Sequence, residues 1–167
     1  CLNDWELANK NFKKALSYAK RIDYKEGIAA FQFNIAFIYG KLKKYDKAFQ
    51  FIEGSIEAHR KINSSHPFIL SCNIYKTFLY VIIGDVKLVK SNFKKLTIKK
   101  TNNDFGYERN WELHKIYNFL GKNSMFFLNN AYLELLDSIN SISSKTDKNY
   151  FIDNVGYNKK IISGWES

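Results

Sequence analysis

The sequence predicts an all-α protein built from antiparallel pairs of helices. Apolar residues recur at steps of three and four along most of the 167 residues, which is the spacing of one helix face. Alternation with period two, the pattern of a half-buried strand, is nowhere sustained. Proline breaks helices, and the only one in the chain is Pro67. Because the connections between periodic segments are short, consecutive helices are expected to pack as antiparallel hairpins.

The periodic segments predict helices in this order: 4–22, 25–42, 45–62, 67–83, 85–99, 107–120, 124–143 and 155–166. Stretches such as "NSSHP" and "TNNDFG" separate them, and their Asn, Ser, Asp and Gly residues favour turns. Asp4, Ser65 and Ser124 are the expected N-caps, because their side-chain oxygens can accept hydrogen bonds from the free N–H groups at helix starts. Hydrophobic residues make up 46% of the chain, which is enough for a folded core.

Part of this pattern repeats with a period of about 40 residues. The unit begins with a large residue, followed by a small residue three positions later. An apolar residue comes four positions after that, and a second small residue three positions further on. Two copies have this form: Trp5, Ala8, Phe12 and Ala15, then Tyr45, Ala48, Ile52 and Ser55. A third copy, at Val89, Phe93 and Leu96, keeps the spacing without the small residues. Small side chains allow helix axes to approach closely, so Ala36 and Ala48 are expected at a helix crossing.

The segment "FNIAFIYGKLKKYDKAFQFIEGSI", Phe33 to Ile56, resembles the tetratricopeptide repeat. The matching positions are Ile35, Ala36, Tyr39, Tyr45, Ala48, Ile52 and Ser55. The resemblance implies a right-handed superhelical stack of helix hairpins that forms a single domain over residues 1–167. Within it, we expect clear repeats at 5–62, a degenerate repeat at 67–99, a weak repeat at 107–143 and a cap at 150–166. A chain that starts inside a repeat is expected to be a fragment of a longer protein.

The segment "AYLELLDSINSISSKTDKNYFIDNVGYNKKIISGW", Ala131 to Trp165, carries a second resemblance. It is similar to the end of tetratricopeptide arrays in bacterial multidomain regulators, which close with the patterns "AY-x-L-L", "F-L-x-N-V" and "N/H-R-x-I-x-x-x-W". The resemblance implies a capping helix over the apolar end of the stack. The expected plug consists of Phe151, Val155, Ile161, Ile162 and Trp165. A signalling role in a bacterial regulator is what this resemblance implies, and a cytoplasmic location is expected from the two cysteines, which suit a reducing compartment.

The resemblance also implies a binding groove, because the first helix of each repeat lines the concave side in this family. By register, the exposed groove positions are Ala30, Phe33, Asn34, Phe37 and Lys41, with Ile74, Tyr75, Phe78 and Ile82 in the next repeat. We select Phe33, Asn34, Phe37, Lys41, Tyr75 and Phe78 as the candidate binding residues. The Asn34 amide can donate to and accept from a peptide backbone, and Lys41 can pair with a carboxylate. The alternative is that Phe33 and Phe37 pack against the next repeat while Asn34 bonds across helices.

No pattern in the sequence predicts catalysis, so a non-catalytic protein without metal or cofactor is expected. His59, His66 and His114 lack the clustered ligands of a metal site or a neighbouring nucleophile. We expect His59 in the core or at a helix end, His66 facing solvent and His114 on a helix surface. Acidic pairs such as Glu134 and Asp137 are expected on solvated faces. No phosphate-cradling glycine motif occurs.

Twenty-six basic and sixteen acidic residues give a net charge of +10. A basic run, "DVKLVKSNFKKLTIKK", could contact phosphates, but its lysines form helical stripes that favour a solvated face. The expected partner is therefore a protein or peptide rather than nucleic acid. The alternatives are a scaffold that forms homodimers through an apolar end at residues 5–19, or a basic nucleic-acid-binding repeat. No apolar run reaches the length of a membrane span.

The cysteines suit a reducing compartment and provide no disulfide framework, since Cys1 and Cys72 are a single distant pair. A chain beginning with Cys1 also raises the alternative of a lipoprotein N-terminus.

Overall fold

The computed structural model describes residues 2–63, 65–96 and 106–166, with side chains from Asp4 onward. All regular secondary structure in these residues is α-helical, which confirms the predicted class. The helices are α1 (Leu2–Arg21), α2 (Lys25–Lys41), α3 (Tyr45–Ile62), α4 (Pro67–Ile82), α5 (Val86–Phe93), α6 (Gly106–Phe119), α7 (Met125–Asn140), α8 (Lys145–Asn154) and α9 (Asn158–Trp165).

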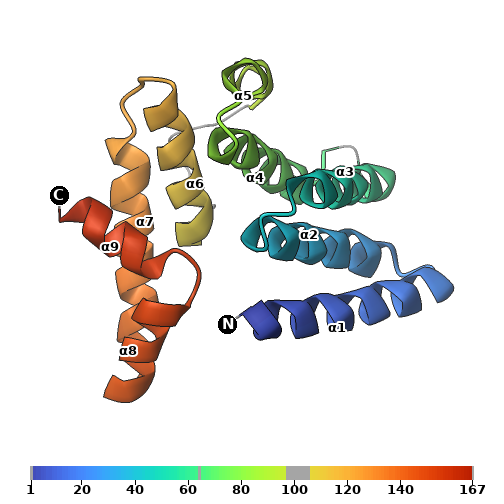
Figure 1. Ribbon diagram of the computed structural model, residues 1–167, viewed down its shortest axis with the longest axis horizontal. Helices are drawn as coiled ribbons and strands as arrows, with labels where there is room; N and C mark the ends of the chain where they lie inside the picture. Colours follow the sequence, from blue (N-terminus) through green and yellow to red (C-terminus); the bar gives the residue numbers. More distant parts are fainter. Residues whose placement is uncertain (1, 64, 97–105, 167) are drawn as a thin grey trace. The chain divides into compact units, whose positions relative to one another are not determined.

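The chain divides into two compact units, Cys1–Leu79 and Tyr80–Ser167. In the first unit, α2 lies between α1 and α3 and packs against both (Figure 1). In the second unit, α6 and α7 form a hairpin, and α9 packs across α7 and against α8. A single domain and a continuous superhelical stack therefore stay predictions, while the α2–α3 and α6–α7 hairpins are observed.

Helix boundaries agree most closely with the sequence in the first unit, where α2 and α3 end within one residue of expectation. The helix expected at 85–99 is shorter, because α5 ends at Phe93 and a turn follows to Leu96. Residues 97–99 lie outside the described part. The helix expected at 155–166 is present as α9, but an additional helix, α8, forms at Lys145–Asn154, where no helix was expected.

The three expected N-caps do not form as predicted. Asp4 lies within α1, and Ser65 precedes α4 by two residues. Ser124 occupies the N-cap position of α7, but its side chain accepts no capping hydrogen bond. Within the described residues, the side chains that accept from helix-start N–H groups are His66 (from Phe68), Asp85 (from Leu88), Asn123 (from Met125) and Ser144 (from Asp147). Acceptors at helix starts are thus present, but the sequence reading placed them at the wrong residues.

The expected close crossing of α2 and α3 is confirmed. Ala36, Ala48 and Ile52 have no exposed surface, and Tyr39 is 4% exposed. Tyr45 is only half-buried. Ser55, which takes the place of an alanine in the repeat pattern, donates through Oγ to the Ala29 carbonyl oxygen of α2 at 2.8 Å. The small residues therefore bring the two backbones close enough for a direct side-chain link across the hairpin.

Four helices end in the same backbone turn, a feature that the sequence reading missed. In each turn one residue has a positive φ, and its backbone N–H donates to the carbonyl oxygen three residues earlier. The N–H of the following residue donates to the carbonyl oxygen five residues before itself. The left-handed residues are Asp23, Lys43, Gly84 and Gly121. Lys43, Gly84 and Gly121 follow α2, α4 and α6, which are the first helices of successive pairs. The turn therefore recurs where a hairpin repeat would place it.

Replacing Lys43 by glycine is expected to stabilise the first unit by about 0.5 to 1 kcal/mol, because Lys43 has a φ of 57° and a side chain is disfavoured there. Urea unfolding of the whole chain measures the change. Lys44→Gly, one position along and without a positive φ, is the control and is expected to be neutral or destabilising. A loss of stability in Lys43→Gly would contradict the assigned turn.

Candidate functional site

The candidate site lies on one face of α2. Phe33, Phe37 and Lys41 are spaced by four residues, and Asn34 flanks them, so all four lie on one side of the helix. Each of these side chains is half-buried. We call Phe33, Asn34, Phe37 and Lys41 the α2 stripe. It combines two aromatic rings with an amide and an ammonium group, in the register that the sequence predicted.

Tyr75 of α4 joins this stripe to a wider aromatic cluster. Its ring centre is 5.7 Å from those of both Phe33 and Phe37, and Trp5 of α1 meets Phe37 edge-on at 6.2 Å. The Tyr75 hydroxyl donates to the Phe37 carbonyl oxygen at 3.4 Å. A Cβ atom at Gly40 would collide with this hydroxyl, so glycine makes room for it. Rings from three helices therefore fix the rotamers on this face.

Burial corrects the expectation that Ile74, Tyr75 and Phe78 of α4 are exposed, whereas Ile82 is exposed as expected. Tyr75 is 1% exposed, Phe78 is 6% exposed and Ile74 has no exposed surface. Tyr75 is enclosed because the rings of Phe33 and Phe37 pack over it. Helix register predicted the face of α4 on which Tyr75 lies, but it did not predict that the neighbouring rings would bury the Tyr75 side chain. These α4 residues lie beneath the site, and the half-buried side chains that a ligand could contact come from α2.

The polar members of the stripe differ in their surroundings. Lys41 Nζ lies 4.8 Å from the ring centre of Phe37, a distance at which the ammonium is attracted to the aromatic face. The Asn34 amide makes no hydrogen bond within the described residues. The alternative reading of this face holds in one respect only. Phe33 and Phe37 pack against Tyr75 of α4, but Asn34 forms no hydrogen bond to another helix within the described residues.

A hollow with a volume of about 600 Å³ lies beside α2 and α3. Its lining includes both charged and apolar residues and comes from the α1–α2 turn, α2 and α3: Asp23, Lys25, Ile28, Gln32, Gly54, Glu57, Ala58 and Lys61. Gln32 Oε1 is buried without a hydrogen-bond partner. The sequence reading did not select these residues, because mixed charges at helical spacing are typical of a solvated face.

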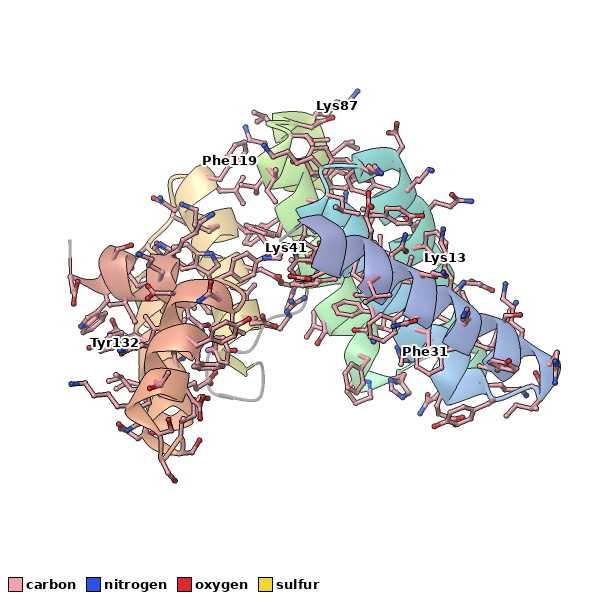
Figure 2. All side chains as sticks on the ribbon, turned by 60° about the horizontal axis from the view of Figure 1, so that its bottom comes forward. Lys13, Phe31, Lys41, Lys87, Phe119 and Tyr132 are labelled. Atoms are coloured by element: carbon pink, nitrogen blue, oxygen red, sulfur yellow. The ribbon has the colours of Figure 1, made fainter. Side chains whose placement is uncertain are left out.

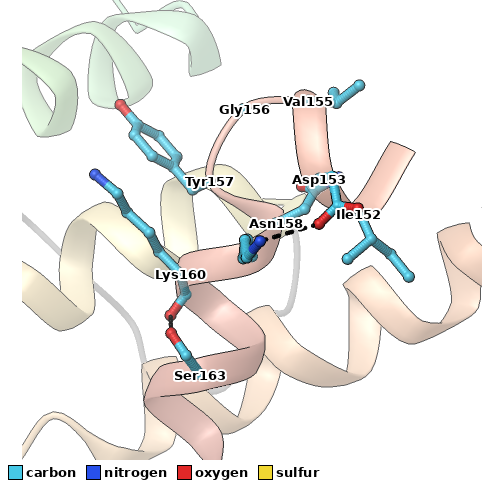
Figure 3. A pocket seen from close by; sticks show the side chains of 9 residues that line it. Ile152, Asp153, Val155, Gly156, Tyr157, Asn158, Lys160 and Ser163 are labelled. Atoms are coloured by element: carbon cyan, nitrogen blue, oxygen red, sulfur yellow. Dashed lines mark hydrogen bonds and ion pairs between the residues drawn. The ribbon is translucent and has the colours of Figure 1, made fainter. Parts of the chain in front are cut away.

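A smaller hollow of about 250 Å³ lies at the α8–α9 corner (Figure 3). Asn158, which is fully buried, donates through Nδ2 to the Phe151 carbonyl oxygen at 2.8 Å and so ties the start of α9 to the end of α8. On the expected plug, Ile161 is buried, but Trp165 is 40% exposed and stacks on Tyr132 at 4.9 Å. The corner is therefore held by an amide hydrogen bond as well as by apolar contacts.

The second unit contains buried charge that the sequence did not reveal. Arg109 Nη2 lies 2.7 Å from Glu112 Oε1, with side chains 9% and 0% exposed. Asn110 Nδ2 donates to Glu134 Oε1 at 3.1 Å. Burial raises the pKa of Glu134, Asn110 lowers it, Asp137 raises it, and the net shift is upward. The expectation of a solvated Glu134 is therefore wrong, because it is half-buried and hydrogen-bonded to α6.

The histidines form contacts with other rings. His59 is 5% exposed, as expected, and stacks on His66 at 4.5 Å. Burial, assisted by the nearby His66, lowers the pKa of His59. His66 is half-buried rather than fully solvent-facing, and His114 is half-buried against Trp111 at 5.3 Å. No group of three or more His, Cys, Asp or Glu side chains within the described residues could hold a metal ion.

The basic run forms α5 and its following turn, where Lys87, Lys90, Lys94 and Lys95 are exposed. Val89 is buried and Phe93 packs edge-on against Tyr117 at 5.1 Å, so the helix buries the expected side. Lys99 and Lys100 lie outside the described residues. No helix in the described part of the chain has both the length and the apolar character needed to cross a membrane.

Comparisons with known proteins do not identify a family for this chain. No protein-family model, curated protein or solved structure matches the chain.

Proposed function

We propose that this chain is a tetratricopeptide-like repeat module that binds an extended peptide segment of a partner protein along the α2 stripe. The observation that carries the proposal is the half-buried Asn34 amide, which has no hydrogen bond in the described residues and lies beside a fixed aromatic cluster. An amide offers one acceptor and two donors, which matches the N–H and C=O groups of a peptide backbone. Recognition would thus tolerate different peptide sequences.

The neighbouring side chains define the peptide class. Phe33 and Phe37 provide half-buried rings for an apolar side chain, and their rotamers are held by Tyr75. Lys41 at the end of the stripe supplies a positive charge for a carboxylate. The best ligand would be an extended segment with an apolar residue followed by an acidic side chain or a C-terminal carboxylate. The C-terminal resemblance supports placing the module in a cytoplasmic bacterial regulator, where binding would be passed to an effector domain.

Asn34→Ala is expected to weaken peptide binding about tenfold, because it removes the hydrogen bonds that the amide would form with the backbone. Panning a phage-displayed peptide library against the wild-type chain supplies the probe, and isothermal titration measures the dissociation constants. Phe37→Ala is expected to weaken the same peptides as strongly. Gln50→Ala, an exposed amide on α3, is the matched control and should leave affinity unchanged. Unchanged affinity in both stripe variants, with helicity retained by circular dichroism, would exclude this site.

Self-association is the second candidate function. Leu7 and Tyr18 on α1 are 60% and 61% exposed, and Ile22 in the turn after it is 72% exposed, which leaves apolar surface open at this end of the chain. Light scattering after size exclusion separates the two functions. A dimer that Leu7→Lys and Tyr18→Lys convert to a monomer favours the scaffold, whereas a monomer at all concentrations excludes it.

A further inference from the structure

Two lysines from different helices meet at one tyrosine of α2. Lys13 Nζ of α1 lies 5.4 Å from the ring centre of Tyr39, and Lys47 Nζ of α3 lies 5.7 Å from it. Tyr39 follows Phe37 by two residues, which is about 200° around a helix. This group is therefore on the other side of α2 from the stripe. We call Asn9, Lys13, Tyr39 and Lys47 the Tyr39 cluster; Lys13 is labelled in Figure 2.

The Tyr39 cluster holds positive charge without a compensating carboxylate. Neither Lys13 nor Lys47 forms an ion pair within the described residues, and both side chains are exposed. Burial raises the pKa of the Tyr39 hydroxyl, but Lys13, Asn9 and Lys47 lower it by more, so that the net shift is downward. Two ammonium groups at one ring repel each other. A bound anion would therefore gain from both charges at once.

The hydrogen-bonding groups of the cluster are suited to an oxyanion. Both ammonium groups, the Tyr39 hydroxyl and the Asn9 amide can donate to oxygen atoms. Hydrogen bonds from charged donors to an oxyanion are stronger than neutral ones, and a dianion would balance both lysines. We propose that the Tyr39 cluster binds a phosphoryl dianion, supplied either as inorganic phosphate or by a phosphorylated side chain of a partner protein.

A single phosphoryl group fits this cluster better than a nucleic-acid strand does. Single-stranded nucleic acids are held by exposed aromatic rings on which bases stack, together with a basic groove that follows the backbone. The Tyr39 ring is 4% exposed and packs on Phe51 at 5.6 Å, so it cannot accept a base. The exposed groups of the cluster that can reach a ligand directly are the ammonium groups of Lys13 and Lys47.

A nuclear magnetic resonance titration of the whole chain tests this site. Inorganic phosphate is added at constant ionic strength, with chloride as the reference anion, and amide and lysine side-chain shifts are followed. Saturable changes are expected at Lys13, Tyr39 and Lys47. Lys13→Ala/Lys47→Ala is expected to weaken binding at least tenfold, and Tyr39→Phe, which keeps the packed ring, should also weaken it. Lys87→Ala, an exposed lysine of α5, should change nothing.

A second arm identifies the source of the phosphoryl group. A short phosphoserine peptide with neutral flanking residues that binds at least tenfold tighter than inorganic phosphate assigns the site to a protein partner, and equal affinity assigns it to free phosphate. Three results would overturn the proposal: shifts that do not saturate, shifts spread equally over all lysines, or unchanged binding in both cluster variants. Tighter binding of a short single-stranded oligonucleotide at the cluster would instead show a nucleic-acid surface.

Discussion

Glu112→Ala is expected to lower the unfolding free energy of the second unit by about 3 to 5 kcal/mol. The Glu112 side chain is fully buried, and its carboxylate is 2.7 Å from the guanidinium of Arg109, which is itself 9% exposed. Removing the carboxylate leaves a positive charge in an environment where water cannot solvate it. Breaking a buried pair in this way costs more than the pair itself contributes, because the desolvation of the remaining partner is less fully offset.

Chemical denaturation monitored by circular dichroism measures this loss, and the same unit provides a control. Lys159 and Asp153 are 3.2 Å apart but 75% and 54% exposed, so Lys159→Ala should change stability by less than about 1 kcal/mol. Replacing both buried partners, as in Arg109→Met/Glu112→Leu, is expected to recover most of the stability lost in Glu112→Ala. Equal losses in Glu112→Ala and Lys159→Ala would show that the buried pair is not a structural element.

This ion pair also shows where sequence reasoning fails. Periodicity assigns charged residues to the solvent side of a helix, and in α6 that assignment is wrong because Arg109, Asn110 and Glu112 are buried. Their burial depends on partners that are adjacent only in the fold, such as Glu134 of α7. A single sequence contains no signal for such pairing. The apolar face of α3, in contrast, was predictable because its packing residues follow helical spacing.

Helix α8 was missed for the opposite reason, since its sequence "KTDKNYFIDN" contains no buried residue. A helix without an apolar stripe gives no periodic signal. Hydrogen bonds at its two ends stabilise α8 instead. Ser144 accepts from the Asp147 N–H at the start, and Asn158 donates to the Phe151 carbonyl oxygen near the end. Ser144 and Asn158 both lie outside the helix, so the periodicity of the helix sequence does not reveal these contacts.

The candidate site was predictable only in part. The α2 stripe follows from helix register, so Phe33, Asn34, Phe37 and Lys41 lie together as expected. The burial of Tyr75 depends on the bulk of two phenylalanines from a neighbouring helix and on the absence of a side chain at Gly40. The Tyr39 cluster could not be predicted for a similar reason, because Lys13 and Lys47 reach the Tyr39 ring only when α1 and α3 both pack on α2.

Ala48→Leu is expected to destabilise the first unit by about 2 to 3 kcal/mol, because the added carbon atoms enter a helix crossing that has no free space. Ala48 of α3 and Ala36 of α2 are both without exposed surface. Ala58→Leu is the matched control on the same helix, since Ala58 lines the open hollow beside α2 and α3. Its change in unfolding free energy should be below about 1 kcal/mol. Urea denaturation of both variants measures the difference.

The same substitution links the crossing to the proposed function. If α2 is displaced from α3 to make room for the larger side chain, the position of α2 relative to Tyr75 and Trp5 must change as well, because those rings pack on the stripe. Peptide affinity should then fall in Ala48→Leu under conditions where it remains folded, although Ala48 itself is buried away from any ligand. Full affinity in a folded Ala48→Leu variant would mean that the stripe does not depend on the crossing, and that the small residues serve stability alone.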